Sequence, residues 1–363
     1  MRYIWLLLSL AALPWRASAD IQIQAEYHAP TNLFAVMDEA AYWYPGFNEP
    51  AHRDAWTERF GWSPEDQAMA DQYQLYRQRT FDDSDQADDA ARFEQDGIFV
   101  ARSSTSADAD PLAKHFFASE TIDDALASLE AITSVEDAKM LRGFYGHFEP
   151  KWRILLEESD AFAAQTATLQ NDLADDRAGA FLERLSAFYG VDPDLEFTVR
   201  LVWWPPINRT FAYVKGETFL LYRHPIRHAE ERDRADITVH EAVHYLSAFQ
   251  PSEQKHALSA AFLEICPADI SSNRYDLLEE PLAIAWGQLA FAKYGKGEPV
   301  DPSLQYYSRA LPEIMGRLAW LHIDAIYESD ATILDGVIEN IARDCAALLD
   351  VRTSLTPKSG ALD

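Results

Sequence analysis

The sequence predicts an α+β fold, mainly helical, with a small and mostly antiparallel sheet next to one buried helix. Apolar residues recur at three- and four-residue spacing through residues 119–190, which is typical of helices. Short segments rich in β-branched and aromatic residues follow Gly190 and are bounded by turn residues, which indicates strands. Residues 237–249 are apolar on nearly all sides, so we expect a buried helix there.

Residues 1–19 are predicted to be a secretory signal peptide. They combine Arg2 near the start, an apolar stretch at 4–13 and small residues before Asp20. We therefore expect cleavage near Ala19 and export of the mature chain, to the periplasm or the medium. The apolar stretch is short for a membrane span, so no stable membrane insertion is expected after cleavage. A retained N-terminal anchor is the alternative.

Residues 20–190 are predicted to form a mainly helical N-terminal region. Its first segment, 21–27, alternates apolar and polar residues and predicts a strand. That strand is a candidate to pair with the sheet of the following region. The boundary between the two regions at residue 190 is therefore not a sharp one. Further elements are expected as helices at 33–43, 53–91 and in several parts of 119–190, and as a short strand at 97–101.

Residues 191–363 are predicted to form a catalytic region. A strand at 197–204 precedes two segments that flank Lys215-Gly216-Glu217, a pattern typical of a hairpin with glycine at its turn. The hairpin strands are expected at 210–214 and 218–222, and helices at 237–249, 253–265, 276–294, 303–324 and 330–349.

The composition is strongly acidic. The chain has 59 acidic and 31 basic residues, a net charge of −28, and loss of Arg2 and Arg16 with the signal peptide makes it −30. Such a surface repels nucleic acid and anionic membranes, so neither is expected as a partner.

The most informative motif is His240-Glu241-Ala242-Val243-His244, which reads H-E-x-x-H. Residues four apart lie on one face of a helix, so both imidazoles can reach one metal ion. Glu241 can contact the water on that metal without being a ligand, which suits a general base. An ordinary buried helix with two hydrogen-bonded histidines is the alternative. The apolar surroundings favour Zn²⁺, because buried polar groups need partners.

The chain resembles gluzincin-type zinc metallopeptidases over about residues 195–295. These are zincins with a thermolysin-like active-site helix, in which a glutamate on a later helix is the third ligand and often opens the pattern E-x-x-A. Glu280-Pro281-Leu282-Ala283 fits that pattern, 36 positions after His244. The metzincin pattern is excluded, because Ser247 and Gln250 stand where it requires Gly and His. The resemblance therefore implies a Zn²⁺ site formed by His240, His244 and Glu280.

Two other acidic residues compete with Glu280 as the third ligand. Glu264 has the spacing of thermolysin-like enzymes, but Cys266-Pro267 follows and would place it at a helix C-terminus. Glu279 adjoins Glu280 and is also suited to the start of a helix.

Several residues are candidates for further roles at this site. Gluzincins commonly use a tyrosine or histidine to bind the developing oxyanion, and the candidates here are Tyr275, Tyr306, Tyr307 and His322. Two more histidines, His224 and His228, lie in the connection before the metal helix and are expected to be solvated or to assist the site.

The predicted function is an exported zinc metallopeptidase that hydrolyses peptide or protein substrates, with Glu241 as general base. Because the hairpin directly precedes the metal helix, an exposed strand edge there could bind an extended peptide. The alternatives are a catalytically silent metal-binding module and a hydrolase of non-peptide amides. Cys266 and Cys345 either form a disulfide or remain buried thiols. Oligomeric state is not indicated.

Overall fold

The computed structural model describes residues 22–43, 48–81, 110–191, 196–206, 211–226, 235–266 and 275–355. The predicted signal peptide and the predicted strand at 97–101 lie outside these residues. The N-terminal part contains β1 (Gln22–Glu26), α1 (Ala29–Ala41), α2 (Pro50–Phe60), α3 (Pro64–Thr80), α5 (Pro111–Ala118), α6 (Ile122–Ala127), η3 (Leu129–Ala131), α7 (Val135–Glu158), η4 (Ser159–Ala161), α8 (Phe162–Leu173) and α9 (Asp176–Tyr189).

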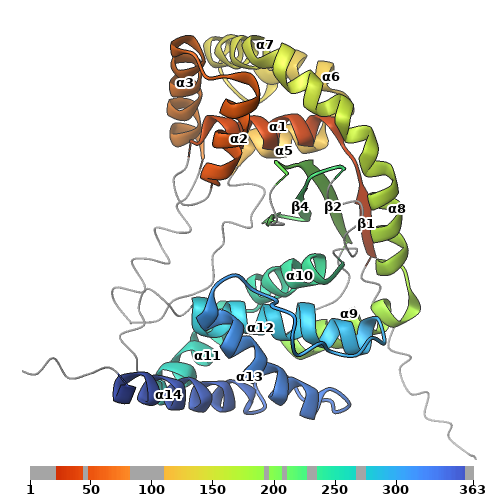
Figure 1. Cartoon of the computed structure of the whole chain (residues 1–363), viewed down its shortest axis with the longest axis vertical. Coiled ribbons are helices and arrows are strands. Elements are labelled where there is room, and N and C mark those ends of the chain that lie inside the picture. The colour runs from red at the N-terminus through yellow and green to blue at the C-terminus, as the bar shows by residue number, and fades with distance from the viewer. Residues whose placement is uncertain are drawn as a thin grey trace, which may run out of the picture.

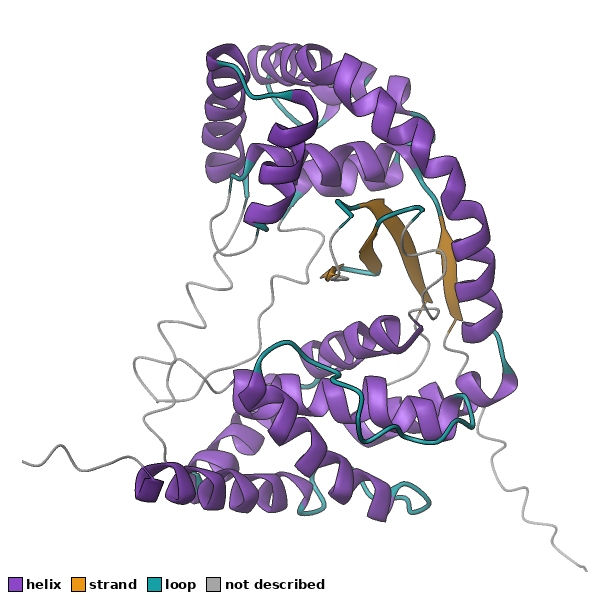
Figure 2. Ribbon diagram, in the orientation of Figure 1, coloured by secondary structure: helices purple, strands orange, loops and turns teal. Residues whose placement is uncertain are grey.

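The C-terminal part contains three strands followed by helices. These are β2 (Glu196–Trp203), β3 (Phe211–Lys215), β4 (Thr218–Arg223), α10 (Ala235–Phe249), α11 (Ser252–Ile265), η6 (Tyr275–Glu279), α12 (Glu280–Ile284), η7 (Ala285–Gly295), α13 (Ala310–Ile326) and α14 (Val337–Leu355). Figure 2 shows helices surrounding one small sheet. The prediction of a mainly helical α+β protein is confirmed.

The prediction of a mostly antiparallel sheet is wrong, because the sheet is mixed. Its order is β1-β2-β4-β3, with β1–β2 and β2–β4 parallel and only the hairpin β3–β4 antiparallel. Long connections allow parallel pairing, and all the helices from α1 to α9 intervene between β1 and β2. The β3–β4 hairpin joins the sheet through its second strand, β4, which pairs with β2.

The sheet separates two hydrophobic cores (Figure 1). Along β2 and β4, the side chains of consecutive residues point to opposite faces of the sheet. Val199 and Phe219 join the core formed with α8–α14, whereas Leu220 and Tyr222 join the core formed with α1–α7. The molecule is therefore layered, with α10, which carries the H-E-x-x-H motif, packed below the sheet and α1 above it.

The two edges of the sheet differ. At the β1 edge, the side-chain amide of Gln170 on α8 accepts a hydrogen bond from the N–H of Ala25 (2.6 Å) and donates to the carbonyl of Ile23 (3.2 Å). One amide thus satisfies backbone groups that a further strand would otherwise pair. At the other edge lies β3, which packs beside α10, and no strand among the described residues pairs with its outer side.

Several predicted helices have different bounds: the helix expected at 33–43 is Ala29–Ala41, the helix expected at 330–349 is Val337–Leu355, and two others differ more. The expected helix at 53–91 is divided, because Gly61 has φ +74° and Ser63 caps a new helix with its side chain accepting from the N–H of Asp66. The expected helix at 303–324 begins only at Ala310. The residues before it form an irregular segment, which matters for the site below.

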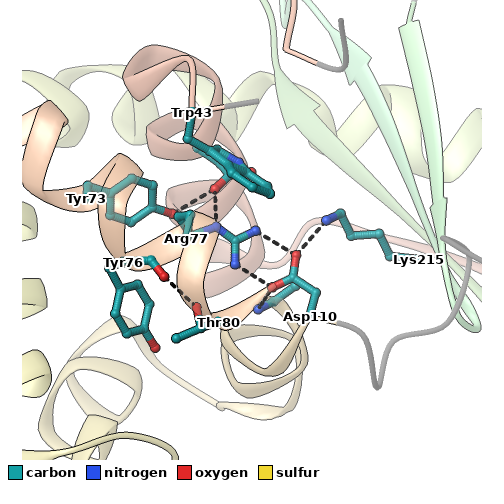
Figure 3. A network of polar contacts seen from close by, with 9 residues as sticks. Trp43, Tyr73, Tyr76, Arg77, Thr80, Asp110 and Lys215 are labelled. Atoms are coloured by element: carbon teal, nitrogen blue, oxygen red, sulfur yellow. Dashed lines mark hydrogen bonds and ion pairs between the residues drawn. The ribbon is translucent and has the colours of Figure 1, made fainter. Parts of the chain in front are cut away.

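A network of buried charges holds the upper layer together (Figure 3). The guanidinium of Arg77 donates to both carboxylate oxygens of Asp110 (2.6 and 2.7 Å) and to Asp38 (2.9 Å). Lys215 of β3 also donates to Asp110 (2.7 Å). We call these four residues the upper cluster. It joins α1, α3, the start of α5 and the sheet.

Cys266 and Cys345 form a disulfide, with their Cα atoms 6.0 Å apart. It connects the end of α11 to α14, so of the two predicted alternatives the disulfide is the one present. None of the helices that the structure describes is both long enough and apolar enough to cross a lipid bilayer.

Candidate metal centre

The two motif histidines of α10 face the same point. The Nε2 atoms of His240 and His244 are 3.2 Å apart, as expected for residues one helical turn apart on one face. The apolar residues of α10 hold this face in place, because Val239 and Val243 are buried in the lower core. His240 is itself buried and His244 is partly accessible.

Glu280 completes the group from a second helix. Its carboxylate oxygens lie 3.5 Å from Nε2 of His240 and 3.6 Å from Nε2 of His244. It stands where the π-helical turn η6 passes into α12, in a helical run that continues through η7 and crosses α10. π-Helical turns are rare and often occur at functional sites.

Gly287 permits this crossing. A Cβ atom built at Gly287 would lie 2.4 Å from both Cα and N of His240, closer than real Cβ contacts. The backbones of η7 and α10 are therefore in direct contact, and only glycine allows this approach. The crossing brings Glu280 to the histidines.

The donor set fits zinc. Ligand atoms at about 2.0–2.1 Å from a tetrahedral zinc ion lie about 3.3–3.4 Å from one another. The two Nε2 atoms are 3.2 Å apart, each of them lies 3.5 or 3.6 Å from a different oxygen of Glu280, and one donor atom from each of the three residues lies within 4.8 Å of the others. Two imidazoles and one carboxylate are also a usual ligand set of catalytic zinc, which keeps a fourth position for water.

The electrostatics of the centre favour positive charge. Burial lowers the pKa of His240, but the hydrogen bond and charge of Glu280 outweigh burial, and the net shift is upward. The carboxylate of Glu280 thus favours positive charge at these donor atoms, and a bound cation would supply such a charge.

Glu241 is next to the centre and has an unusual pKa. Burial is the main cause that raises it, the charge of His240 lowers it, and the charge of Glu280 raises it again, to a final pKa of about 7. A carboxyl group with this pKa can accept and return a proton near neutral pH.

Tyr307 reaches the centre from the irregular segment before α13. Its ring lies nearly parallel to that of His240, with centroids 6.4 Å apart, and its hydroxyl lies near enough to Glu280 for the charge of that carboxylate to raise the pKa of Tyr307. Burial and then the charge of Glu280 raise its pKa to about 12, so the hydroxyl keeps its proton and remains a donor. Of the three oxyanion candidates whose side chains the structure describes, Tyr307 is the one that lies at the centre.

The carboxylate of Glu313 fixes the backbone that carries Tyr307. Its Oε2 accepts from the N–H groups of Tyr306 (3.1 Å) and Tyr307 (2.8 Å), while Oε1 accepts from Arg317 (2.7 Å). Gln288 of η7 donates to the carbonyl of Tyr306. The irregular segment is thus hydrogen-bonded to both neighbouring helices.

The other candidates lie away from the centre. Glu264 is exposed, and Glu279 accepts a hydrogen bond from Ser247 (2.8 Å) outside the three-residue group. Tyr306 donates to the carbonyl of Asp301, and His322 pairs with Asp344. His224 accepts from the N–H of Ile226. His228 and the side chain of Tyr275 lie outside the described part of the chain.

Three residues at this site were not predicted from the sequence: Gly287, Glu313 and Arg309, whose Nη2 donates to the hydroxyl oxygen of Tyr307 (3.1 Å). Gly287 had a visible signal, because an isolated glycine within an apolar helical pattern usually has a packing reason. Glu313 and Arg309 had no signal in the sequence, because their importance depends on where the segment before α13 lies.

Comparison of the chain with models of protein families, with curated proteins and with solved structures finds no match.

Proposed function

We propose that this protein is a zinc-dependent metallopeptidase of the gluzincin type that acts after export. The observation that carries the proposal is the convergence of His240, His244 and Glu280 at separations that suit zinc, with Glu241 beside them. The sequence resemblance supports the same three ligands. Neither the resemblance nor the geometry depends on the other.

The residues of the chain divide the chemistry between them. When bound, zinc supplies a Lewis acid for the scissile carbonyl and for the attacking water. Glu241 accepts a proton from that water and delivers it to the leaving amine, for which a pKa of about 7 is well suited. Tyr307 keeps its proton and can donate a hydrogen bond to the oxygen on which negative charge develops.

The substrate class is supported by the edge of the sheet. β3 packs beside α10 and no strand among the described residues pairs with its outer side, whereas the β1 edge is closed by Gln170. An extended peptide added to β3 would run along the metal helix, with its backbone held by strand hydrogen bonds. This geometry favours a peptide over a compact amide as the substrate.

The test compares metal content and peptide hydrolysis in the mature chain and three variants. His244→Ala and Glu280→Ala should lose most of the zinc, because each removes one of three ligands. Glu241→Gln should retain zinc and lose about 10²–10⁴-fold in hydrolysis, because it removes proton transfer alone. Metal is measured by atomic emission and hydrolysis on a mixed peptide library, with a chelator-treated control.

Three outcomes contradict the proposal in different ways. Full activity of Glu241→Gln would exclude its role as general base. Zinc bound without any cleavage would favour a metal-binding module. Products from a non-peptide amide alone would identify a hydrolase of another class.

A further inference from the structure

The segment before α13 is exposed over most of its length, yet it brings Tyr307 to the candidate metal centre. Within residues 301–309 only Tyr306 and Tyr307 are partly covered, and the others are exposed. The segment belongs to neither a helix nor a strand. Burial in a core therefore does not determine where it lies, and its backbone groups depend on side chains for their hydrogen bonds.

The carboxylate of Glu313 makes the contact closest to Tyr307. This side chain belongs to the first turn of α13, and the residue is only 8% exposed. Its Oε2 accepts from the N–H groups of Tyr306 (3.1 Å) and Tyr307 (2.8 Å), which belong to the peptide bonds before and after Tyr306. Because each peptide bond is planar, one carboxylate orients the backbone on both sides of that residue. Hydrogen bonds to an ionised acceptor are about twice as strong as neutral ones.

Two further side chains hold the same segment. Arg317 donates to Oε1 of Glu313 (2.7 Å) and to the carbonyls of Pro302 (3.1 Å) and Leu304, so it fixes both the carboxylate and the start of the segment. Gln288 of η7 donates to a carbonyl within it (3.2 Å). Of these three side chains, Glu313 is the one that bonds the backbone of Tyr307 itself.

We propose that Glu313 is a positioning residue for hydrolysis, which keeps the hydroxyl of Tyr307 where negative charge develops. This inference rests on the proposed function, in which Tyr307 donates to that oxygen. Glu313 is not among the three donors of the candidate centre, so it acts through Tyr307 and not on the metal. A shift of about 1 Å in a group that contacts the reacting atoms can cost about 10²-fold in rate.

An ordinary structural role is the alternative. A carboxylate in the first turn of a helix is stabilised by the helix dipole, and Glu313 has that place in α13. Such a role predicts a loss of stability when Glu313 is substituted. It predicts no dependence of that substitution on the hydroxyl of Tyr307.

A double-mutant cycle separates the two roles. Tyr307→Phe should lower kcat by about 10²–10³-fold with little change in KM, because the hydroxyl bonds the oxygen only as charge develops. Glu313→Leu removes both acceptor oxygens and should lower kcat by up to the same factor. In the Tyr307→Phe background, Glu313→Leu should cause no further loss, since the group that it positions is absent.

Two more variants complete the kinetic test. Glu313→Gln keeps one oxygen that can accept from the two N–H groups, so it should retain part of the rate that Glu313→Leu loses. The matched control is Glu339→Leu, which removes a carboxylate from the first turn of α14 and should leave kcat unchanged. Zinc content should be the same in every variant.

A second readout needs no cleavage. Crystal structures of Glu313→Leu and Glu339→Leu show where the ring of Tyr307 lies. In Glu313→Leu it should leave its nearly parallel place 6.4 Å from the ring of His240, and in the control it should keep that place. Thermal unfolding shows whether each variant is folded, and Glu313→Gln replaces Glu313→Leu in both readouts if the latter is unfolded.

The proposal is overturned if Glu313→Leu leaves kcat unchanged, if its loss adds to that of Tyr307→Phe, or if the ring of Tyr307 does not move. It is also overturned by unfolding of both Glu313 variants, or by loss of zinc, since the effect would then run through the fold or the metal. Absence of cleavage by the unsubstituted zinc protein is the failure of the proposed function. In that case the ring position alone decides whether Glu313 positions Tyr307.

Discussion

Two buried polar clusters lie on opposite sides of the sheet, and they balance charge in different ways. The upper cluster pairs two cations with two anions: Arg77 and Lys215 with Asp38 and Asp110. Arg77 has no exposed side-chain surface and Asp110 only 2%. Arg77 and Lys215 together hold the pKa of Asp110 far below its usual range, against the effect of burial.

The lower cluster combines two acids, Glu241 and Glu280, with two imidazoles that are neutral in their ordinary state. Its donor atoms converge on one point, and its carboxylates raise the affinity of His240 for a proton. The comparison teaches that burial alone does not identify a functional site. A cluster that pairs its charges supports the fold, whereas one whose donor atoms converge on one point is suited to bind a cation.

The largest effect is expected from removing the fully buried cation of the upper cluster. Arg77→Met should lower the free energy of unfolding by about 3–5 kcal/mol, because buried Asp38 and Asp110 lose the guanidinium that they share. Arg79→Met, on the same helix, is the control. Its pair with Asp137 is exposed and should contribute under about 1 kcal/mol.

Urea unfolding measures both variants, and metal content measures whether the two clusters are independent. Arg77→Met should bind as much zinc as the unsubstituted chain under conditions where it is folded. A loss of zinc together with stability would show that the clusters are coupled and would break the comparison.

An intermediate effect is expected where α10 and η7 cross. Gly287→Ala places a methyl group against the backbone of His240, which should lower stability by about 1–3 kcal/mol and weaken zinc binding. The control is Gly179→Ala in α9, where a Cβ meets no atom within 4 Å. Alanine there should be neutral or stabilising, by up to about 1 kcal/mol.

Chelator competition and thermal unfolding measure these effects. Unchanged zinc affinity in Gly287→Ala would mean that the lower cluster tolerates a shift of the helix. The tight crossing would then not be needed to position Glu280.

The smallest effect is a pH dependence in a third cluster, which joins α3 to α7. Burial raises the pKa of Asp66, but hydrogen bonds from Ser63, Lys151 and His147 outweigh it and lower the pKa to about 2. A depressed pKa stabilises the fold above the unfolded value near 4, and this stability is lost as the pH falls to about 2. The contribution is about 2 kcal/mol.

The free energy of unfolding of the unsubstituted chain and of Asp66→Asn should therefore differ at pH 5 and converge towards pH 2. Urea titrations at several pH values measure this difference. A constant difference over the range would show that Asp66 acts through its neutral hydrogen bonds, and not through its charge.

Much of the local structure could be predicted from the sequence. Hairpin strands β3 and β4 follow from Gly216 between two segments of strand-forming residues. The bounds of helices were less accurate, because Gly61 and the start of α13 depend on single turn and cap residues. The parallel pairing of β1 with β2 could not be derived, since nothing local determines which way a distant strand enters a sheet.

The candidate site could also be predicted only in part from the sequence. Helix geometry alone puts His240 and His244 on one face, because their spacing is a property of the α-helix. Sequence spacing left Glu264, Glu279 and Glu280 as competing ligands, and only the crossing at Gly287 selects Glu280. It was likewise the packing of the segment before α13 that brought Tyr307 to the centre.

What the sequence determined by itself was whatever depends on neighbours a few residues apart: the face of α10 that carries both histidines, the hairpin and the acidic composition. What only the tertiary structure decided was the meeting of groups far apart in the chain, namely Glu280 with the two histidines, the disulfide and the order of the strands. The physical reason is that torsion angles and helical periodicity fix short separations. Long ones depend on which surfaces can pack together without voids or unpaired polar groups.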